Sequence, residues 1–301
     1  MRFFITGASG WIGSAVTREL LEAGHEVLGL ARSAAAAARV RELGGDVVRG
    51  SLTDLDVLAE AAGAADGVIH LGFVHDFDDF ATSIAIDRGA LEALGGALEG
   101  SGRALVVASG FAGLAPGSVA TEETPHDPAV AGPRAGNAQL TDGFAERGVA
   151  VVFARFAPTV HGIGDHGFIS AIAQVARDRG VSAYVGEGTN RWGAVHRLDA
   201  AHLVRLAAER PGVARVVHAS AEEGIPTRSI AEALGDRLGL PAVSIPAEDA
   251  DAHFGWIGRF FGADLAGSSV LTRERFGWRP EHPTLLEDIA AGGYDAPPAS
   301  R

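Results

Sequence analysis

The stretch Thr6-Gly-Ala-Ser-Gly-Trp-Ile-Gly13 decides the fold of this chain, because its three glycines separate a short apolar run from a helical pattern. Arg2 to Ile5 predicts a buried strand, and apolar residues at positions 15, 16, 20 and 21 recur at the spacing of a helix. A strand, a glycine-rich turn and a helix in this order place a pyrophosphate against the N-terminus of the helix. The opening of the chain therefore predicts a dinucleotide site; an incidental glycine turn is the alternative.

The composition narrows the class of protein. The chain has 301 residues, 47% of them hydrophobic, so one large α/β domain or two modest ones can bury a core. A net charge of −13 without a basic run argues against nucleic acid or an anionic membrane as partner. Cysteine is absent, which excludes disulfides and thiolate metal sites. No signal peptide or membrane span is evident, so we expect a soluble, cytoplasmic protein.

Strands and helices alternate along the first half of the chain. This alternation predicts an α/β fold, a Rossmann-type doubly wound parallel sheet, with ligands beyond the carboxyl ends of its strands. The segment 110–133 carries four prolines and is expected to be a loop. The further strands are expected at 26–30, 46–49, 67–70, 103–108 and 149–154, and the further helices at 34–43, 54–64, 79–99 and 134–148.

The pattern loosens after position 160, where short strands and loops mix with helices. We expect a dinucleotide-binding domain over residues 1–160 and mainly a smaller C-terminal substrate cap over residues 161–301. Part of the segment 194–220 is expected to return to the first domain's sheet.

The end of the second predicted strand bears on the choice of cofactor. In this fold a carboxylate there binds the ribose 2′-hydroxyl of NAD, whereas an arginine accommodates the 2′-phosphate of NADP. Here the strand is followed by Ala31, which leaves space, and by Arg32, whose guanidinium forms a fork suited to phosphate. The sequence therefore favours NADP(H) over NAD(H); an arginine that only caps a surface turn is the alternative.

Five stretches together resemble the extended or atypical short-chain dehydrogenase/reductases, which include the NAD-dependent epimerase/dehydratase group. They occur in the expected order and span most of the chain, but they do not specify a substrate. These stretches are Thr6–Gly13, His70-Leu71-Gly72, Ala108-Ser109-Gly110, Arg155–Gly162 and Asn190–Asp199.

The resemblance implies roles for individual residues. Those expected around the pyrophosphate are Gly7, Ser9, Gly10, Trp11, Ile12 and Gly13. Those expected at the 2′-phosphate and the adenine are Arg32, Ser33, Ser51 and Leu52, although the family usually has Asp where Ser51 stands. Those expected at the nicotinamide half are Leu71, Gly72, Phe73, Pro158 and Val160, with Ser109 as the active-site serine.

The chain departs from the family at its proton donor, a Tyr with a Lys four residues later. Register from the helix start places this pair at Arg134 and Ala138, and the sequence contains no lysine at all. Ordinary Tyr/Lys acid–base chemistry is therefore excluded. Arg134 cannot donate a proton, because its guanidinium stays charged; it could bind a substrate carboxylate or a cofactor phosphate.

Other residues could supply the proton. Ser109 is a poor acid alone, whereas His161 carries an imidazole, a group generally suited to acid–base catalysis, and follows the segment expected at the nicotinamide. The alternative for His161 is burial against the loop backbone. His75 with Asp76, like Asp165 with His166, is expected to be an ordinary loop pair. His196 and Asp199 are expected to order the cap loop, and no spacing of histidines indicates a metal site.

Two functions remain open at this point. The first is an NADP(H)-dependent oxidoreductase that reduces a small, fairly apolar carbonyl, imine or activated alkene with Ser109, His161 or water as donor. The second is a non-catalytic NADP(H)-binding redox sensor or regulator. Epimerase or dehydratase activity on nucleotide sugars ranks last, because it depends most on the missing pair. Helices 79–99 and 134–148 could pair in a homodimer.

Overall fold

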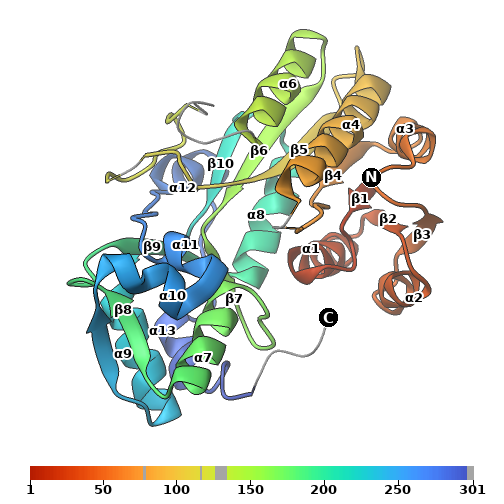
Figure 1. The fold of residues 1–301 in the computed structure, drawn as a ribbon. Coiled ribbons are helices and arrows are strands. Elements are labelled where there is room, and N and C mark those ends of the chain that lie inside the picture. Colours follow the sequence, from red (N-terminus) through yellow and green to blue (C-terminus); the bar gives the residue numbers. More distant parts are fainter. Residues whose placement is uncertain (77–78, 116, 126–133, 297–301) are drawn as a thin grey trace.

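A computed structural model describes residues 1–76, 79–115, 117–125 and 134–296, except the side chains at 134, 135 and 259. Its centre is a seven-stranded sheet in the order β3-β2-β1-β4-β5-β6-β10, with every neighbouring pair parallel (Figure 1). This confirms the predicted Rossmann-type doubly wound fold. The strands are β1 (Arg2–Thr6), β2 (Glu26–Ala31), β3 (Asp46–Arg49), β4 (Gly67–His70), β5 (Ala104–Gly110), β6 (Ala150–Phe156) and β10 (Val216–Ala219).

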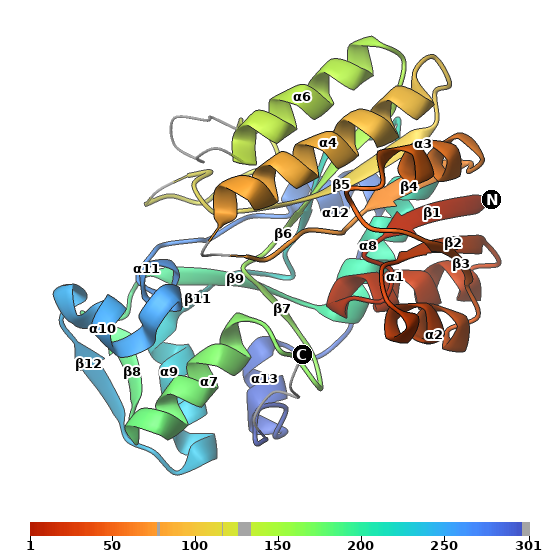
Figure 2. The ribbon, with the colours of Figure 1, turned by 45° about the vertical axis from the view of Figure 1, so that its right-hand side comes forward.

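Helices cover both faces of the sheet, and each face has its own hydrophobic core (Figure 2). Because strands such as β1 and β4 are buried along almost their whole length, both of their faces carry apolar side chains. One face is covered by α1 (Trp11–Glu22), α2 (Ala34–Glu42) and α8 (Arg197–Glu209), and the other by α3 (Leu55–Gly63), α4 (Phe80–Leu98) and α6 (Arg134–Glu146).

The sheet changes direction between β1 and β4. The chain builds β1, β2 and β3 outward to one edge and then returns to place β4 on the other side of β1. Loops after β1 and β4 consequently diverge to opposite faces and leave a crevice at the carboxyl ends of the strands. The site described below lies at this crevice.

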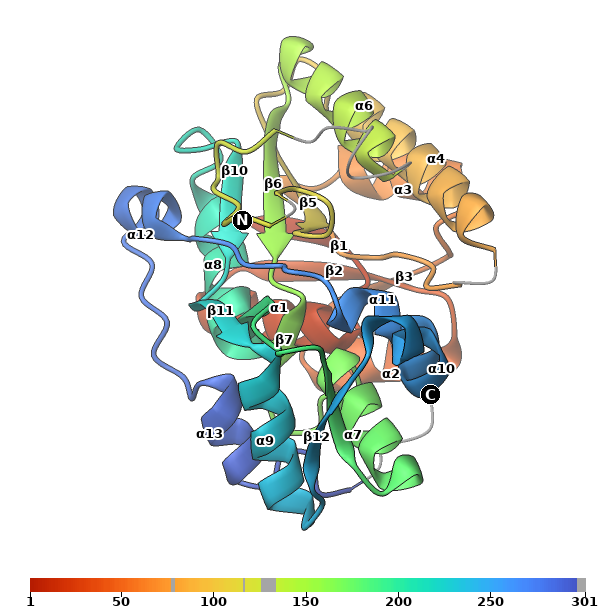
Figure 3. The same cartoon turned by 60° about the vertical axis from the view of Figure 1, so that its left-hand side comes forward.

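The second lobe has a separate core and packs beyond the carboxyl ends of the sheet (Figure 3). The chain crosses between the lobes more than once, since α8 and β10 both belong to the sheet lobe. The strands of the cap are β7 (Thr159–His161), β9 (Arg191–His196) and β11 (Glu222–Pro226), which form one sheet, and β8 (Ser182–Val185) and β12 (Ala242–Ile245), which form another. The remaining helices are α7 (Phe168–Arg179), α9 (Thr227–Leu238), α10 (Ala250–Phe254), α11 (Gly258–Phe261), α12 (Val270–Phe276) and α13 (Leu285–Ala290), with one-turn 3₁₀ segments at Ala247–Asp249 and Gly255–Ile257.

Asp199, in the first turn of α8, ties the C-terminal segment to the sheet lobe. Its carboxylate accepts hydrogen bonds from the backbone N–H groups of Glu281 and His282, and its carbonyl accepts one from Trp278 Nε1. The buried side chain of Trp278 and the carboxylate of Asp199 therefore fix the segment 278–282, about eighty residues further along the chain, against α8.

Across the helices of the described ranges, we find none with both the length and the apolar character that a membrane crossing requires.

A buried polar cluster lies below the loop that follows β5. His218 Nδ1 lies 2.7 Å from the carbonyl oxygen of Ser268, and its Nε2 lies 3.4 Å from Nη1 of Arg155. The first ring nitrogen therefore donates and the second accepts, which requires a neutral imidazole. Burial, together with the charge of Arg155, lowers the pKa of His218 to about 4, although the nearby Glu122 opposes the shift.

We predict that His218 makes the fold acid-sensitive. Its folded pKa lies below the unfolded value of 6.5, so the unfolded chain binds a proton first and the free energy of unfolding falls as the pH drops below 6.5. From about pH 7 to about pH 5 this loss should amount to on the order of 1–2 kcal/mol. Urea unfolding at several pH values should show a smaller loss for His218→Gln. An unchanged slope in His218→Gln would contradict the assignment.

Candidate functional site

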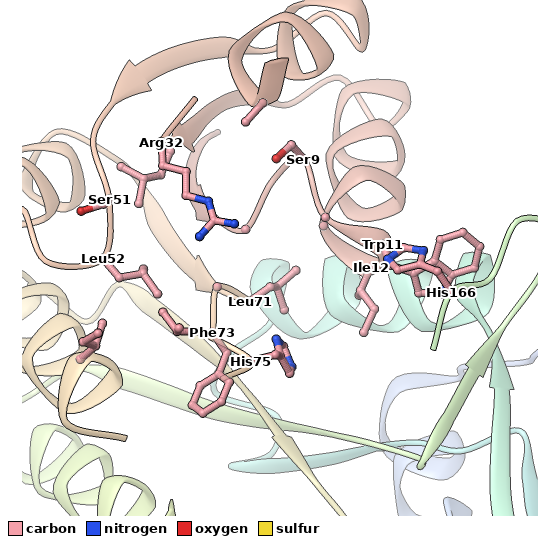
Figure 4. Close-up of a pocket in the computed structure, with 18 of the residues that line it drawn as sticks. Ser9, Trp11, Ile12, Arg32, Ser51, Leu52, Leu71, Phe73, His75 and His166 are labelled. Atoms are coloured by element: carbon pink, nitrogen blue, oxygen red, sulfur yellow. The ribbon is translucent and has the colours of Figure 1, made fainter. Parts of the chain in front are cut away.

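A cavity of about 900 Å³ opens at the carboxyl ends of β1, β2, β3 and β4, where the sheet changes direction (Figure 4). Both lobes contribute to its wall, and Arg32 is the one charged Arg, Asp or Glu side chain among the described residues that line it. The sheet lobe supplies Gly7, Ser9, Gly10, Trp11, Ile12, Gly13, Leu30, Arg32, Ala36, Gly50, Ser51, Leu52, Thr53, Leu71, Gly72, Phe73, Val74, His75 and Ile86, and the cap supplies His166, Gly167, Phe168, Ala171 and Trp256.

At each of the three glycines of the opening turn, an added side chain would meet different neighbouring atoms. Gly7 has φ +72°, and a Cβ there would lie 2.8 Å from the backbone nitrogen of Gly72. A Cβ on Gly13 would lie 2.0 Å from the carbonyl oxygen of Gly7, so no side chain fits between helix and turn. At Gly10 the nearest atom to such a Cβ is 3.1 Å away, and this glycine lines the cavity. The absence of a side chain at Gly10 thus leaves the backbone open to a ligand.

The N-terminus of α1 is suited to an anion. Gly10 is its N-cap and offers no side-chain acceptor, and the first turn contains no acidic residue. The first N–H groups of a helix have no partner within the helix and carry its positive dipole end. Trp11 and Ile12 stand at these positions in the cavity wall, which is the geometry in which helices hold phosphate.

Arg32 lies at one end of the cavity, and its side chain extends into the space between the β2 and β3 loops and the glycine turn (Figure 4). Ser51 and Leu52 lie on the same side. Ser51 is part of a local turn, because its N–H and hydroxyl both donate to Asp54, which lowers the pKa of that carboxyl. Ser33 is not among the described lining residues; its hydroxyl oxygen caps α2 by accepting the N–H of Ala36.

Behind the glycine turn, a buried network joins four elements of the sheet lobe. Thr6 Oγ1 accepts the N–H of Gly72 at 3.0 Å and lies 2.8 Å from His70 Nδ1, while His70 Nε2 lies 3.2 Å from Asp87. Asn137 Nδ2 donates to the same carboxylate at 2.7 Å. If Asp87 is charged, His70 donates from Nε2 and accepts from Thr6, so each of these polar atoms is satisfied. The network positions the start of the β4–α4 loop, which lines the cavity.

Some expected site residues lie away from the cavity wall. Ser109, Pro158, Val160 and His161 are not among the described lining residues, and the side chain of Arg134 falls outside the part of the chain that is described. Val160 contributes its carbonyl oxygen, which accepts a 2.7 Å hydrogen bond from Trp11 Nε1 and so ties β7 to the glycine turn.

His161 is buried, which was the alternative to a role as proton donor. Its side chain has no exposed surface, and Nδ1 lies 2.6 Å from Asp288 in α13. Nε2 lies 3.8 Å from Glu222, without a hydrogen-bond partner among the described atoms. Burial raises the pKa of Glu222. An imidazole enclosed by the cap in this way cannot reach a molecule in the cavity, so the structure does not favour His161 as the proton donor.

Asp165 and His166 are neighbours in sequence with opposite orientations. The Asp165 carboxylate turns inward, where it accepts the N–H of Gly167 at 2.7 Å and the hydroxyl of Tyr294 at 2.9 Å. Burial raises the pKa of Asp165 in spite of these bonds. His166 faces the cavity and packs edge-on against Trp11, with ring centroids 5.5 Å apart. Tyr294 therefore positions the loop that carries His166.

Four other wall residues follow from the tertiary structure. Ile86, Phe168, Ala171 and Trp256 line the cavity, and sequence analysis assigned none of them to the site. Phe168 is the first residue of α7, and no local sequence pattern marks Phe168 or Trp256 as part of a site. His75, which we expected to be an ordinary loop residue, also lines the cavity beside Phe73, with ring centroids 5.1 Å apart.

His196, Asp199 and His282 come close enough together to suggest a metal site. However, the rings of His196 and His282 are stacked, with centroids 4.8 Å apart and planes 9° from parallel. The lone pair of an imidazole nitrogen lies in the plane of its ring, so two stacked rings cannot direct lone pairs at one ion. These three residues do not fit a shared metal ion, and the contacts of Asp199 are those of a structural clamp.

Comparisons with known proteins agree with this geometry. A model of the NAD dependent epimerase/dehydratase family matches residues 3–219. The chain is 46% identical to the uncharacterized protein C2A9.02 of Schizosaccharomyces pombe and 44% identical to the uncharacterized protein YLL056C of Saccharomyces cerevisiae, over 98% and 97% of its length and 100% and 98% of theirs. Among solved structures, it is similar to a UDP-glucose-4-epimerase from Stenotrophomonas maltophila with bound NAD and formylated UDP-arabinopyranose, with a TM-score of 0.74, 19% identity and coverage of 98% and 97%.

The buried network gives a prediction about stability. Asp87→Ala removes the carboxylate shared by His70 and Asn137 and leaves their donors buried without it, which should lower the free energy of unfolding by about 1–3 kcal/mol. Chemical denaturation measures the change. The control Glu92→Ala, on the same helix, removes one partner of an exposed ion pair with Arg88 and should cost less than about 0.5 kcal/mol. Equal losses in the two variants would show that the network contributes nothing specific.

Proposed function

The chain belongs to the NAD-dependent epimerase/dehydratase family, and we propose that within it the protein is an NADP(H)-dependent oxidoreductase. Its substrate would be a small, fairly apolar carbonyl, imine or activated alkene, reduced by hydride transfer without the usual Tyr/Lys pair. The observation that carries the proposal is the cavity itself, in which the glycine turn, the N-terminus of α1 and Arg32 line one continuous wall.

The choice of NADP(H) rests on Arg32. It stands directly after β2, at the position where this fold binds either a free ribose or a 2′-phosphate, and its side chain extends into the cavity. Among the described lining residues no carboxylate competes for a ribose hydroxyl there. A guanidinium offers two parallel donors to a phosphate, so Arg32 would discriminate between the two cofactors.

The proton must come from a residue other than the missing tyrosine. A reduced nicotinamide supplies a hydride when bound, and a proton must then reach the oxygen of a carbonyl, the nitrogen of an imine or the α-carbon of an activated alkene. Two imidazoles belong to the described part of the wall. His75 lies beside Phe73 and Leu71, where the family places the nicotinamide, whereas His166 lies against Trp11 at the N-terminus of α1 (Figure 4). We therefore assign the donor role to His75.

Two alternatives are less well supported. The absence of lysine and the lack of a family-type acid would also suit a redox sensor that binds NADP(H) without turning over a substrate. A nucleotide-sugar substrate is disfavoured because its diphosphate needs cations, and beyond Arg32 the described wall offers no arginine.

We predict that Arg32→Ala separates the two cofactors. Loss of the guanidinium should weaken NADPH binding by about 10–100-fold, equivalent to one or two charge-assisted hydrogen bonds, and change NADH binding by less than about threefold. Calorimetric titration of both nucleotides measures this. The matched control is Arg49→Ala, an exposed arginine of β3 that donates to the Arg32 carbonyl but does not line the described cavity. Similar losses for both nucleotides would refute the 2′-phosphate role.

We predict that His75→Gln lowers turnover by about 10²–10⁴-fold while cofactor affinity stays within about twofold, because only the proton donor is lost. NADPH oxidation with a panel of aldehydes, imines and enones measures the rate. His166→Gln is the control; if it lowers turnover as much as His75→Gln does, the assignment is wrong. Tight cofactor binding without turnover of any compound would favour the sensor.

A further inference from the structure

Two aromatic side chains of the cap line the cavity. Phe168 begins α7, and Trp256 lies in the turn between α10 and α11. Their ring centroids are 5.6 Å apart with planes at 63°, and Phe260 packs against Phe168 from a centroid distance of 5.6 Å. Trp256 remains 46% exposed, whereas Trp192 behind Phe168 is fully buried. The cap thus holds a large aromatic ring at the cavity surface and supports it with further rings.

The opposite side of the same cavity is apolar as well. Leu71, Phe73 and Val74 follow β4, and Ile86 projects from α4. Phe73 is held by edge-on contact with Phe80, at a centroid distance of 6.0 Å. Arg32, the charged residue of the described wall, belongs to the other end of the cavity. The space between the cap and the β4 loop therefore has mainly hydrophobic walls, with the imidazoles of His75 and His166 as polar groups.

We propose that this space is a binding slot for a planar, uncharged aromatic ring that is conjugated to the group to be reduced. The proposal rests on the proposed function, which it deepens by naming the substrate class. Aromatic side chains gain from edge-to-face and offset contacts with another ring beyond the gain from burying apolar area. A charged substrate would lose its hydration in this slot without finding a described counter-charge. Trp256 would be covered by the substrate, which accounts for a large exposed aromatic side chain at a cavity.

Binding of an unreactive probe tests the slot independently of catalysis. With the protein saturated in NADP⁺, 2-naphthamide should bind at least about tenfold more tightly than decalin-2-carboxamide, which has the same carbon skeleton and amide but no planar ring. Trp256→Leu and Phe168→Leu keep an apolar side chain and should reduce this preference to below about twofold. Val270→Ala removes an exposed apolar side chain of α12 that lies outside the described cavity wall. This control variant should leave the preference for 2-naphthamide unchanged. Calorimetry gives the affinities, and thermal melts establish that each variant is folded.

The outcomes separate this proposal from the proposed function. Equal affinity for the two amides, or a preference that survives in Trp256→Leu, overturns the slot; because Trp256 is half exposed, that variant alone decides if Phe168→Leu does not fold. Reduction of aliphatic aldehydes as readily as aromatic ones also overturns the slot but leaves the reductase intact. A selective naphthamide site without turnover of any carbonyl supports the slot and refutes the reductase. If NADP⁺ does not bind, the cofactor proposal fails and the same titration without nucleotide still decides the slot.

Discussion

The close approach of three backbone segments is the constraint on which the rest of the structure depends. Gly7 touches the backbone of the β4–α4 loop at Gly72, and Gly13 touches Gly7, so that a single Cβ at either glycine would clash with backbone. Backbone atoms cannot move aside as a flexible side chain can, and this contact therefore sets where β1, β4 and α1 meet. It leaves the first N–H groups of α1 facing the cavity, and it places the segment 71–75 beside them.

The cap completes the site through contacts that cross long stretches of sequence. Trp11 Nε1 donates to the carbonyl of Val160, Tyr294 holds Asp165, and Asp199 holds the segment around His282. Each uses a buried or half-buried polar group whose loss would leave a donor or acceptor unsatisfied. The Trp11 and Asp199 contacts tie the sheet lobe to the cap and to the C-terminal segment, whereas Tyr294 and Asp165 both belong to the cap. The result is a cavity whose end at Arg32 and the glycine turn belongs to the sheet lobe, and whose other end is lined by both lobes.

The helix interface at which the resemblance places the Tyr/Lys pair carries other residues in this chain. Ala138, at the position expected for the lysine, packs into the core on the α4 and α6 side of the sheet. The preceding Asn137 points to Asp87 and joins the network that positions His70 and the β4 loop. The polar side chains of Asn137 and Asp87 at this helix interface hydrogen-bond to each other and to His70 and so stabilise the fold. Under the function that we propose, chemistry in the cavity depends on wall residues such as His75, and specificity depends on the aromatic lining of the cavity.

The sequence by itself determined the features that are local. A strand, three glycines and a helix within the first twenty residues predict the sheet and its phosphate turn, and Arg32 is placed by its position directly after β2. It could not determine which histidine faces the cavity, because local spacing is the same for a buried and an exposed imidazole. Asp288, the partner of His161, lies 127 residues further along the chain. The cap residues of the cavity wall come from positions 166 to 256. Only tertiary packing brings such groups together: their side chains are positioned by contacts with distant segments, and those contacts leave no periodic signal in the chain.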